Sequence, residues 1–378
     1  MTRFDVAVVG GGIAGTSVAY FLAEHCSVVV LEREATLGVH STGRSAAIFT
    51  ECYGDRVVRQ LAIASRGFLE QTAPGFSDQP LLSDRSILFI ATHAQADRME
   101  LHLEDYRSMV PDVRRLRPKE AVALCPALDG RRLAGAIHEL EARDLDVHAL
   151  HMGYQRGIRE RGGEIRPGFG VDRVTRAGEE WVIGSGEAEI TAAVLIDAAG
   201  AWCDVVAALA GASPVGLVPK RRTAFSFDSP GWEVHRWPMV IDLDEQFYFK
   251  PEGPGLLGSP ADEMPMEPHD VRHREEDVAL GIERIEAATT LSIRSVRNAW
   301  AGLRSFVVDH RPVNGWDDSV PGFYWLAGQG GFGIKTSPAM GRYAAAMVLR
   351  RTPPAGFAEA GLNPEALGVS RLRGLAGV

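Results

Sequence analysis

The stretch FDVAVVGGGIAGTSVAYFLAEHCSVVVLE, residues 4–32, decides the fold of this chain. It begins with a short apolar run, Phe4 to Val9, that ends in glycines, a pattern typical of a buried parallel strand. Residues 13–24 place their apolar side chains on one face of a helix, and Ser27 to Leu31 has the pattern of a second buried strand. The three segments together have the size of one β–α–β crossover unit.

The glycines of this unit, GGGIAG at 10–15, form a GxGxxG motif between the strand and the helix. Gly10 permits the tight turn, Gly12 lets the backbone approach a pyrophosphate, and Gly15 lets the helix pack on the strand. The helix N-terminus favours phosphates, and Glu32, about 20 residues further on, is placed to accept hydrogen bonds from a ribose diol. A flexible turn beside a surface acid is the alternative, which the flanking strand and helix disfavour. The motif therefore predicts a bound dinucleotide.

Length and charge limit the classes of function. The chain has 378 residues, with 40 Lys and Arg against 49 Asp and Glu, so its net charge is −9. At this length we expect two domains. The acidic balance argues against nucleic acid as a partner, because such a protein needs clustered positive charge. No apolar run approaches the ~20 residues needed to cross a bilayer, so no transmembrane segment is expected.

The cysteines and the start of the chain indicate a reducing compartment. Cys26, Cys52, Cys125 and Cys203 are scattered, without the CxxC spacing of metal sites, so neither a metal centre nor a disulfide framework is expected. Met1 leads directly into the expected strand, without the basic start and apolar core of a secretory signal. We therefore expect a cytoplasmic protein, with peripheral membrane contact only through a quinone acceptor.

Three further segments add glycine-rich or hydroxyl-rich loops. HSTGRSAA (40–47) surrounds Arg44 with small residues, and it could give backbone N–H and hydroxyl donors to a pyrophosphate and pass under a flat ring; a polar surface loop is the alternative. LIDAAG (195–200) and AGQGGFGI (327–334) each follow a strand with glycines. The helix that begins in the latter could stabilise negative charge on a reduced flavin. These segments favour FAD over NAD, and Glu32 would repel the 2′-phosphate of NADP, although Arg33 weakens that argument.

The nucleotide-binding pieces alternate along the chain with segments of mixed-sheet character. We therefore expect an α/β fold in which a Rossmann-like FAD-binding domain is interleaved with a substrate domain built on a mixed or antiparallel sheet plus helices. The predicted boundaries are 1–82, 145–215 and 300–365 for the FAD-binding domain. They are 83–144 and 216–299 for the substrate domain.

Taken together, GGGIAG with Glu32, STGRSAA (41–47), DAAGAW (197–202) and GQGGFGI (328–334) resemble the glycine oxidase/D-amino-acid oxidase family of FAD-dependent amine oxidoreductases. The resemblance extends over nearly the whole chain, and its D-arginine dehydrogenase branch is the most similar. It implies non-covalent FAD and oxidation of an amine to an imine, which water hydrolyses to a 2-oxo acid and ammonia. The segments that resemble this branch are PKRR (219–222), FYFKP (247–251), LLGSPA (256–261) and WAGLRSF (300–306).

The motifs and the resemblance together predict the residues that hold FAD. They are Gly10, Gly12, Ile13, Ala14, Gly15, Glu32, Arg33, Ser41, Thr42, Arg44, Ser45, Ala46, Ala47, Val171, Ala199, Gly200, Trp202, Gly328, Gly330, Gly331, Gly333, Ile334 and Lys335.

An amino-acid substrate needs a carboxylate clamp, and the planar fork of arginine matches a carboxylate. The candidates are Arg222, in the strand-like stretch 220–227, and Arg304, in the strand-like stretch 299–306. Arg221 and Arg222 point to opposite faces of a strand, so only one of them can face the site. The resemblance implies that Arg222 and Arg304 form the clamp. It adds as partners Tyr53, Tyr248 and the backbone of Gly331.

The reaction demands little acid–base chemistry from the chain. Flavin N5 takes a hydride from Cα, and the substrate amine must lose a proton. Some relatives carry a histidine just after the STGRSAA loop, whereas this chain has Ile48. The histidines at 40, 138, 148 and 151 fit surface or packing roles. We therefore assign no catalytic side chain beyond the flavin.

Ile87 bears on the side chain of the substrate. Members of this branch that act on cationic side chains are expected to place a carboxylate near residues 86–89, where this chain has Ile87. A guanidinium buried there would lose its hydration without gaining a partner. We therefore expect neutral or apolar D-amino acids as substrates, unless Asp84 or Glu51 restores a negative wall.

Related chemistries remain open. A sarcosine or N-methyl amino acid oxidase, or a 2-hydroxy acid dehydrogenase, would use the same arginine clamp, and a non-catalytic dinucleotide-fold binding protein is a more remote alternative. The electron acceptor is expected to be a quinone, another carrier or oxygen.

Overall fold

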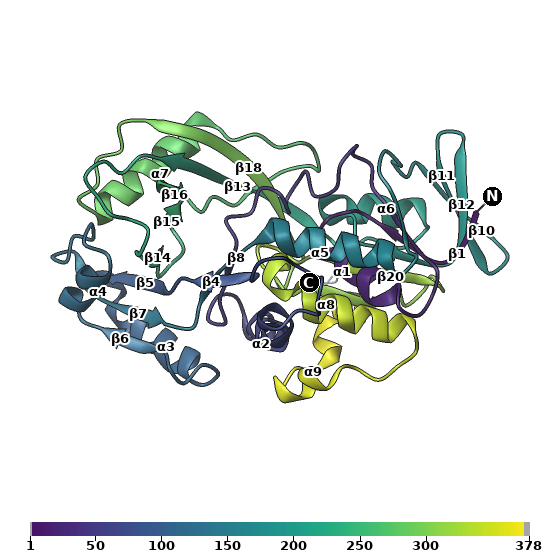
Figure 1. Cartoon of the computed structure of the whole chain (residues 1–378), viewed down its shortest axis with the longest axis horizontal. Coiled ribbons are helices and arrows are strands. Elements are labelled where there is room, and N and C mark those ends of the chain that lie inside the picture. Colours follow the sequence, from purple (N-terminus) through teal and green to yellow (C-terminus); the bar gives the residue numbers. More distant parts are fainter. Residues whose placement is uncertain (1, 374–378) are drawn as a thin grey trace.

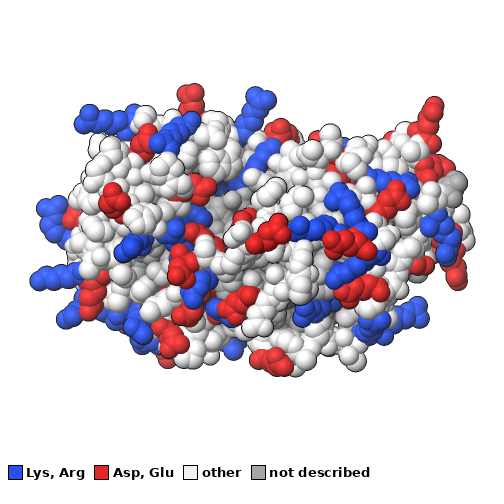
Figure 2. Space-filling model, viewed as in Figure 1, with Lys and Arg blue, Asp and Glu red and all other residues white. Residues whose placement is uncertain are grey.

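Two large β-sheets build the two lobes of the protein in the computed structural model, which describes residues 2–373 (Figure 1). The lobe at the right of Figure 1 contains the N-terminal strand, and the lobe at the left contains the antiparallel hairpins of the middle of the chain. On the face drawn in Figure 2, acidic and basic side chains are interspersed. That face therefore lacks the clustered positive charge typical of nucleic-acid binding.

The first sheet is organised around one long strand, β12 (Ala188–Asp197). On one side β12 pairs in parallel with β1; on the other, β11 covers its first half and β20 its second. Strand β12 is thus enclosed on both edges, which explains its apolar run near residue 195. The remaining strands of this sheet are β1 (Thr2–Val9), β2 (Val28–Leu31), β9 (Glu164–Arg166), β10 (Arg173–Ala177), β11 (Glu180–Ser185), β19 (Val313–Trp316) and β20 (Phe323–Ala327).

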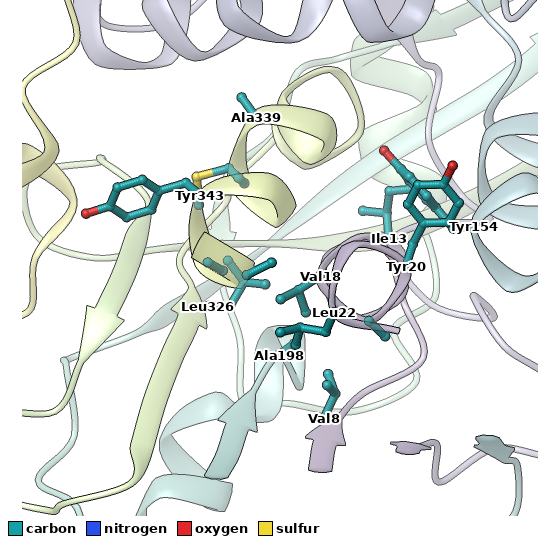
Figure 3. Packing of buried hydrophobic residues seen from close by; sticks show 14 of the residues in the cluster. Val8, Ile13, Val18, Tyr20, Leu22, Tyr154, Ala198, Leu326, Ala339 and Tyr343 are labelled. Atoms are coloured by element: carbon teal, nitrogen blue, oxygen red, sulfur yellow. The ribbon is translucent and has the colours of Figure 1, made fainter. Parts of the chain in front are cut away.

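Helix α1 (Ile13–Leu22) lies at the centre of the first lobe, packed between the sheet, α5 (Val147–Glu160) and α8 (Gly333–Val348). Figure 3 shows Val18 and Leu22 of α1 next to Ala198 and Leu326 of the sheet. The backbones of α1 and α8 approach closely, because a β-carbon on Gly341 would lie 2.8 Å from the carbonyl carbon of Ser17. The two ends of the chain therefore share one core.

The second sheet is mixed. Strand β18 (Val296–Phe306) pairs with β13 (Val218–Phe227) along its whole length, and β14 (Met239–Asp242) runs parallel to β5 (Ile87–Thr92). Because β18 belongs to this sheet throughout, it crosses the domain boundary expected at residue 300. The other strands of the sheet are β6 (Arg114–Leu116), β7 (Leu133–Glu139), β15 (Tyr248–Glu252), β16 (Gly255–Ser259) and β17 (Met264–Pro265).

A small sheet of β3 (Ile48–Phe49), β8 (Arg143–Leu145) and β4 (Leu82–Asp84) lies between the lobes. Strand β4 leads into β5 of the second sheet, and β8 leads from β7 of that sheet back to α5; the chain crosses between the lobes again before β13 and after β18. The remaining helices are α2 (Arg56–Glu70), α3 (Ala96–Arg107), α4 (Pro118–Leu124), α6 (Cys203–Leu209), α7 (Glu275–Ala288), α9 (Ala355–Glu359) and α10 (Ser370–Arg373).

The α/β fold with mixed sheets is confirmed, and several elements begin where the sequence predicts. Helix α1 begins at Ile13 and β2 at Val28, close to the predicted starts at 13 and 27. Helix α5 begins directly after Asp146, whose carboxylate accepts a hydrogen bond from the backbone N–H of Ala149. Asp55 caps α2 in the same way, through Val58. Helix α7 was not predicted, although three acidic residues in its first turn, beginning at Glu275, match the helix dipole.

Candidate active site

The GxGxxG turn is shaped by close backbone contacts. Gly10 has φ +109°, and a β-carbon there would lie 2.4 Å from the carbonyl oxygen of Ala198. A β-carbon on Gly15 would lie 1.9 Å from the carbonyl oxygen of Gly10. Gly10 therefore lets the turn fit against β12, and Gly15 lets α1 pack onto β1. Gly12 is different, because it lines the cavity and a β-carbon there would have only Thr42 Oγ1 within 4 Å, at 3.3 Å.

Glu32 fixes this turn from the end of β2. Its Oε2 accepts a hydrogen bond from the N–H of Gly11 at 2.8 Å, and its Oε1 accepts one from the N–H of Glu34 at 2.9 Å. The side chain is buried yet borders the cavity, so its remaining lone pairs are available to a ribose diol. Nearby, the guanidinium of Arg33 lies 4.8 Å from the ring centre of Trp202, and both residues line the same end of the cavity.

A cavity of about 520 Å³ begins at this turn and extends to the second sheet. It passes through the first lobe to the glycine-rich turn before α8 and ends at β13, β15 and β18. Most of the residues predicted to bind FAD line it: Gly10, Gly12, Ile13, Ala14, Glu32, Arg33, Ser41, Thr42, Arg44, Ser45, Ala46, Val171, Ala199, Gly200, Trp202, Gly328, Gly330, Gly331, Gly333 and Ile334.

Three residues predicted to bind the cofactor lie outside this cavity. Gly15 acts in helix packing, as described above. Ala47 and Lys335 border a smaller adjoining pocket of about 60 Å³, called here the inner pocket. The Lys335 amino group donates hydrogen bonds to the carbonyl oxygens of Thr50 and Tyr53, at 2.9 and 2.6 Å. Its observed hydrogen bonds are thus to the protein backbone.

The loop at 40–47 is anchored by its own side chains. Ser41 Oγ donates to the carbonyl oxygen of Leu303 at 2.6 Å, and Thr42 Oγ1 accepts from the N–H of Ile13 at 3.0 Å. The Arg44 guanidinium bonds the Val271 carbonyl oxygen at 2.9 Å, as well as other protein groups. Ser41 therefore uses its hydroxyl donor within the protein. Within residues 2–373, Thr42 and Ser45 only accept, Ser45 from the N–H of Ala47 at 3.2 Å, so both hydroxyls keep a donor for a pyrophosphate.

The predicted carboxylate clamp lies where the cavity meets the inner pocket. Arg222, Tyr248, Arg304 and Gly331 border both spaces. Arg221, on the opposite face of β13, pairs instead with Asp262 and Asp277 at 3.2 and 2.6 Å. The alternation of the strand therefore separates the two neighbouring arginines as predicted.

The two clamp arginines differ in their charge environment. Arg222 donates to Glu263 Oε1 at 2.8 Å. Burial raises the pKa of Glu263, but Lys220 and Arg222 lower it by more, so this carboxyl stays ionised and offsets the charge of Arg222. Arg304 forms no ion pair with any residue in the described range 2–373, and the Tyr53 hydroxyl lies 3.5 Å from its Nη1. A partly buried arginine that contacts no carboxylate favours an anionic ligand.

Tyr53 and Glu245 close the inner pocket opposite Arg304. The Tyr53 hydroxyl donates to Glu245 Oε2 at 2.8 Å. Burial raises the pKa of Tyr53 to about 12, and the Glu245 carboxylate adds to the increase, so the hydroxyl keeps its proton. Glu245 has φ +57°, a strained conformation for a residue with a β-carbon. Glu245 was not among the predicted site residues; the three acids at 242, 244 and 245, between two strands, were the available signal.

Ile87 does not line either space, which corrects the expectation that it forms the pocket wall. It is fully buried in β5, and its partner in the neighbouring parallel strand is Met239. Met239 and Ile241 of β14 border the inner pocket, joined by Ile48 and Ala261. These four side chains form one apolar side of the inner pocket, and Glu245 adds a carboxylate to its lining.

The two acids considered as substitutes for a negative wall lie elsewhere. Asp84 is fully exposed, and Glu51 binds Arg66 at 2.8 Å. Neither borders the inner pocket; Glu245 does.

Replacing Ile87 with Glu should destabilise the fold rather than change the substrate. A carboxylate at this position would be buried without a partner, so we expect the free energy of unfolding to fall by roughly 2–5 kcal/mol. Chemical denaturation of Ile87→Glu beside Ile87→Met measures the difference. The Met variant conserves volume and should lose less than about 1.5 kcal/mol. A stable Glu variant with new activity on D-arginine would restore Ile87 to the pocket.

A glycine-lined cavity that leads from Glu32 to two arginine side chains has the arrangement that a dinucleotide-dependent enzyme needs. The family description "FAD dependent oxidoreductase" (DAO) matches residues 5–347. FAD-dependent oxidoreductase domain-containing protein 1 of Bos taurus is 27% identical over 400 residues, covering 92% of this chain and 81% of that protein. Mitochondrial dimethylglycine dehydrogenase of Mus musculus is 22% identical, covering 97% of this chain and 44% of that protein. The crystal structure of glycine oxidase from Geobacillus kaustophilus has the same fold, with a TM-score of 0.82 at 21% identity, covering 96% of this chain and 99% of that one.

The chain therefore belongs to the DAO family of FAD-dependent oxidoreductases. The residues present fit FAD, because the glycine turns at 10–15 and 328–333 border one continuous cavity with Glu32 at one end and the two clamp arginines at the other. In residues 2–373, no helix combines the length and the apolar character that crossing a bilayer requires.

Proposed function

We propose that this FAD-dependent oxidoreductase converts D-amino acids with neutral or apolar side chains to 2-oxo acids and ammonia. The single observation that supports this most is Arg304, a partly buried arginine at the junction of the cofactor cavity and the inner pocket that forms no ion pair within residues 2–373. A zwitterionic substrate would supply the missing carboxylate. Bound FAD supplies the acceptor for the hydride from Cα.

Each part of the substrate has a matching group in this arrangement. The carboxylate would bind Arg304 and, more weakly, Arg222, because Glu263 already occupies part of the Arg222 fork. The side chain would lie against the apolar wall made by Ile48, Met239, Ile241 and Ala261. Loss of a hydride from Cα of the neutral amine would leave an iminium ion, which water cleaves to the 2-oxo acid and ammonium. The final electron acceptor would be a quinone, another carrier or oxygen.

The chain contributes position and exclusion of water rather than a base. Ile48, which stands where some relatives carry a histidine, borders the inner pocket as an apolar side chain. The substrate amine would therefore lose its proton to solvent as it binds. The D configuration is supported by the resemblance of four segments to D-arginine dehydrogenase.

Non-covalent FAD is part of the proposal. The four cysteines, at 26, 52, 125 and 203, are outside the residues that border the cavity and the inner pocket. A thioether bond to the flavin has no candidate sulfur among these lining residues. We therefore expect denaturation to release the flavin into the supernatant.

Anaerobic reduction of the purified flavoprotein tests the proposed function. The flavin absorbance is followed while D-leucine, D-methionine, D-arginine, their L-forms, sarcosine, dimethylglycine and lactate are added one at a time. Rapid bleaching by neutral D-amino acids alone is the expected result. Bleaching by D-arginine alone would keep the reaction and overturn the assignment of the side chain. Failure of every primary amine to bleach the flavin would overturn oxidative deamination.

N-methyl amino acid oxidation is the second candidate. The likeness to dimethylglycine dehydrogenase favours it, since that protein is named for a tertiary amine. The same carboxylate clamp would serve, and the apolar Ile48 would tolerate a methyl group on nitrogen. Faster bleaching by sarcosine or dimethylglycine than by any primary amine would establish this reaction instead.

Glu245→Gln should reduce the residual activity on cationic substrates. The amide can still accept the Tyr53 hydrogen bond, but the negative charge at the inner pocket is lost. We expect the ratio of kcat/KM for D-arginine to that for D-leucine to fall about tenfold, because one charge acts over a few ångströms in a partly screened site. Asp244→Asn is the matched control, since this neighbouring acid binds Gln95 and Arg98 outside the pocket. An equal effect of both variants would remove Glu245 from the recognition of charge.

A further inference from the structure

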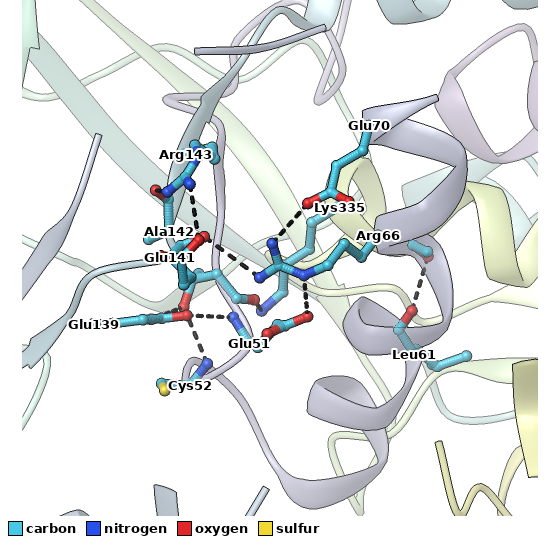
Figure 4. Close-up of polar contacts among 12 residues, drawn as sticks. Glu51, Cys52, Leu61, Arg66, Glu70, Glu139, Glu141, Ala142, Arg143 and Lys335 are labelled. Atoms are coloured by element: carbon cyan, nitrogen blue, oxygen red, sulfur yellow. Dashed lines mark hydrogen bonds and ion pairs between the residues drawn. The ribbon is translucent and has the colours of Figure 1, made fainter. Parts of the chain in front are cut away.

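Two buried charged residues hold one short segment beside the inner pocket, residues 50–53. Glu139 lies at the end of β7 and Lys335 in the first turn of α8, and their relative exposures are 1% and 3%. Figure 4 shows both side chains approaching the segment that carries Glu51 and Cys52, beside Arg66 of α2. The two residues come from different lobes of the molecule.

The hydrogen bonds of this pair go to consecutive groups of the segment. Glu139 Oε2 accepts from Thr50 Oγ1 at 2.5 Å, and Oε1 accepts from the N–H of Glu51 at 2.7 Å. Lys335 Nζ donates to the carbonyl oxygens of Thr50 and Tyr53 at 2.9 and 2.6 Å. Thr50 therefore joins the two charges, and the backbone of Tyr53 is tied directly to the lysine.

The held segment carries Tyr53 into the carboxylate site. The Tyr53 hydroxyl lies 3.5 Å from Arg304 Nη1 and donates to Glu245. Its ring packs edge-on against Phe332, with the ring centres 5.3 Å apart. A shift of the 50–53 backbone would move this hydroxyl away from Arg304, so the geometry of the carboxylate site depends on the support beneath it.

We propose that Lys335, acting with Glu139, is a positioning residue for the substrate carboxylate, because it fixes the Tyr53 segment against Arg304 through two backbone hydrogen bonds. This inference rests on the proposed function, in which Arg304 binds that carboxylate. It replaces the prediction that Lys335 binds the cofactor, because the Lys335 ammonium donates its hydrogen bonds to backbone carbonyl oxygens of Thr50 and Tyr53.

Burial makes this support sensitive to pH. Burial lowers the pKa of Lys335 to about 8, although the nearby Glu139, Cys52 and Glu51 raise it in part; Arg59 lowers it further. Burial also raises the pKa of Glu139. The lysine is thus cationic at neutral pH and loses its charge as the pH rises through about 8. Above that pH the hydrogen bonds to the segment weaken.

Binding of an inert carboxylate tests the inference without requiring catalysis. Calorimetric titration of the yellow holoenzyme with propionate, which has no amine to oxidise, gives the dissociation constant. Lys335→Met should raise this constant about tenfold or more and raise KM in parallel, while flavin content and kcat change less than about threefold. Lys119→Met on α4 is the surface control. If Lys335→Met does not fold, Thr50→Val breaks the link to Glu139 and should shift both constants in the same direction.

A double-mutant cycle separates positioning from direct contact. If Lys335 acts through Tyr53, then Lys335→Met should add less than about twofold to the loss already produced by Tyr53→Phe. Full additivity would show that the lysine binds the ligand itself and would overturn the inference. Unchanged propionate affinity and KM in a folded Lys335→Met protein would also overturn it.

The pH dependence of propionate binding provides a further test of the role of Lys335. The wild-type dissociation constant for propionate should rise as the pH passes through about 8, and this rise should be absent in Lys335→Met. The same rise in both proteins would contradict the inference. Absence of propionate binding by the wild type at every pH would overturn the proposed function together with it.

Discussion

Replacing Arg304 with Met is expected to lower kcat/KM for a neutral D-amino acid by about two to three orders of magnitude, chiefly through KM. The substitution removes the partly buried guanidinium that lies between the cofactor cavity and the inner pocket and has no ion pair within residues 2–373. The substrate carboxylate would then keep only Arg222, whose guanidinium is already partly occupied by Glu263. Steady-state kinetics with D-leucine or D-methionine, at matched flavin content, measures the loss.

Two further variants, Arg304→Lys and Arg297→Met, show whether the loss of activity is specific to the guanidinium of Arg304. The lysine keeps the charge but not the planar fork, so it should recover only part of the affinity. Arg297 lies on the same strand, with its side chain 48% exposed, and its removal should change kcat/KM by less than about twofold. Retention of normal KM by Arg304→Met would place the carboxylate site elsewhere and remove the main support for the proposed function.

Gly12→Val should abolish flavin binding while leaving the fold intact. Gly12 has φ −74° and ψ −175°, an extended conformation that valine adopts readily. Thr42 Oγ1, at 3.3 Å, is the one heavy atom within 4 Å of a β-carbon placed there. The branched side chain would instead occupy cavity space next to the N-terminus of α1, where the pyrophosphate approaches the backbone. We expect flavin content to fall below about a tenth of the wild-type value.

Absorbance at the flavin band measures flavin binding, and the melting temperature of the apoprotein measures the stability of the fold, so the two measurements together separate loss of flavin from loss of stability. Gly67→Val on α2 is the control, because a β-carbon there has no neighbour within 4 Å. Gly15→Val should instead lower the stability of the protein, because a β-carbon at residue 15 would lie 1.9 Å from the carbonyl oxygen of Gly10. A yellow Gly12→Val protein would contradict the placement of the pyrophosphate at this turn.

Local spacing explains why some parts of the fold and the site were predictable. The strand, helix and strand at residues 4–32 follow from apolar periodicity and three glycines, all within one short stretch. The direction of Arg222 also follows from a local rule, because side chains alternate along β13 and Arg221 faces the opposite way.

Other parts depend on long-range pairing that periodicity does not encode. The pocket wall is set by β14, which aligns with β5 only in the folded protein, so Met239 rather than Ile87 borders the inner pocket. Glu245 lies in a short turn between two strands, where an acid normally contacts only solvent. Lys335 acquires its role because α8 reaches a segment almost three hundred residues earlier in the chain.

The shared core of α1 and α8 sets the order in which a newly made chain can mature. The turn at 10–15 leaves the ribosome early, but the glycines at 328–333 that border the same cavity, and the helix that packs against α1, are synthesised near the end. Until then α1 has an uncovered apolar face, and the emerging chain is exposed to aggregation. Flavin loading is therefore a late event, and a message or protein cut before residue 333 would yield colourless product that is also poorly folded. Yellow colour in a cell extract consequently reports folded chains that extend through α8 rather than total synthesis.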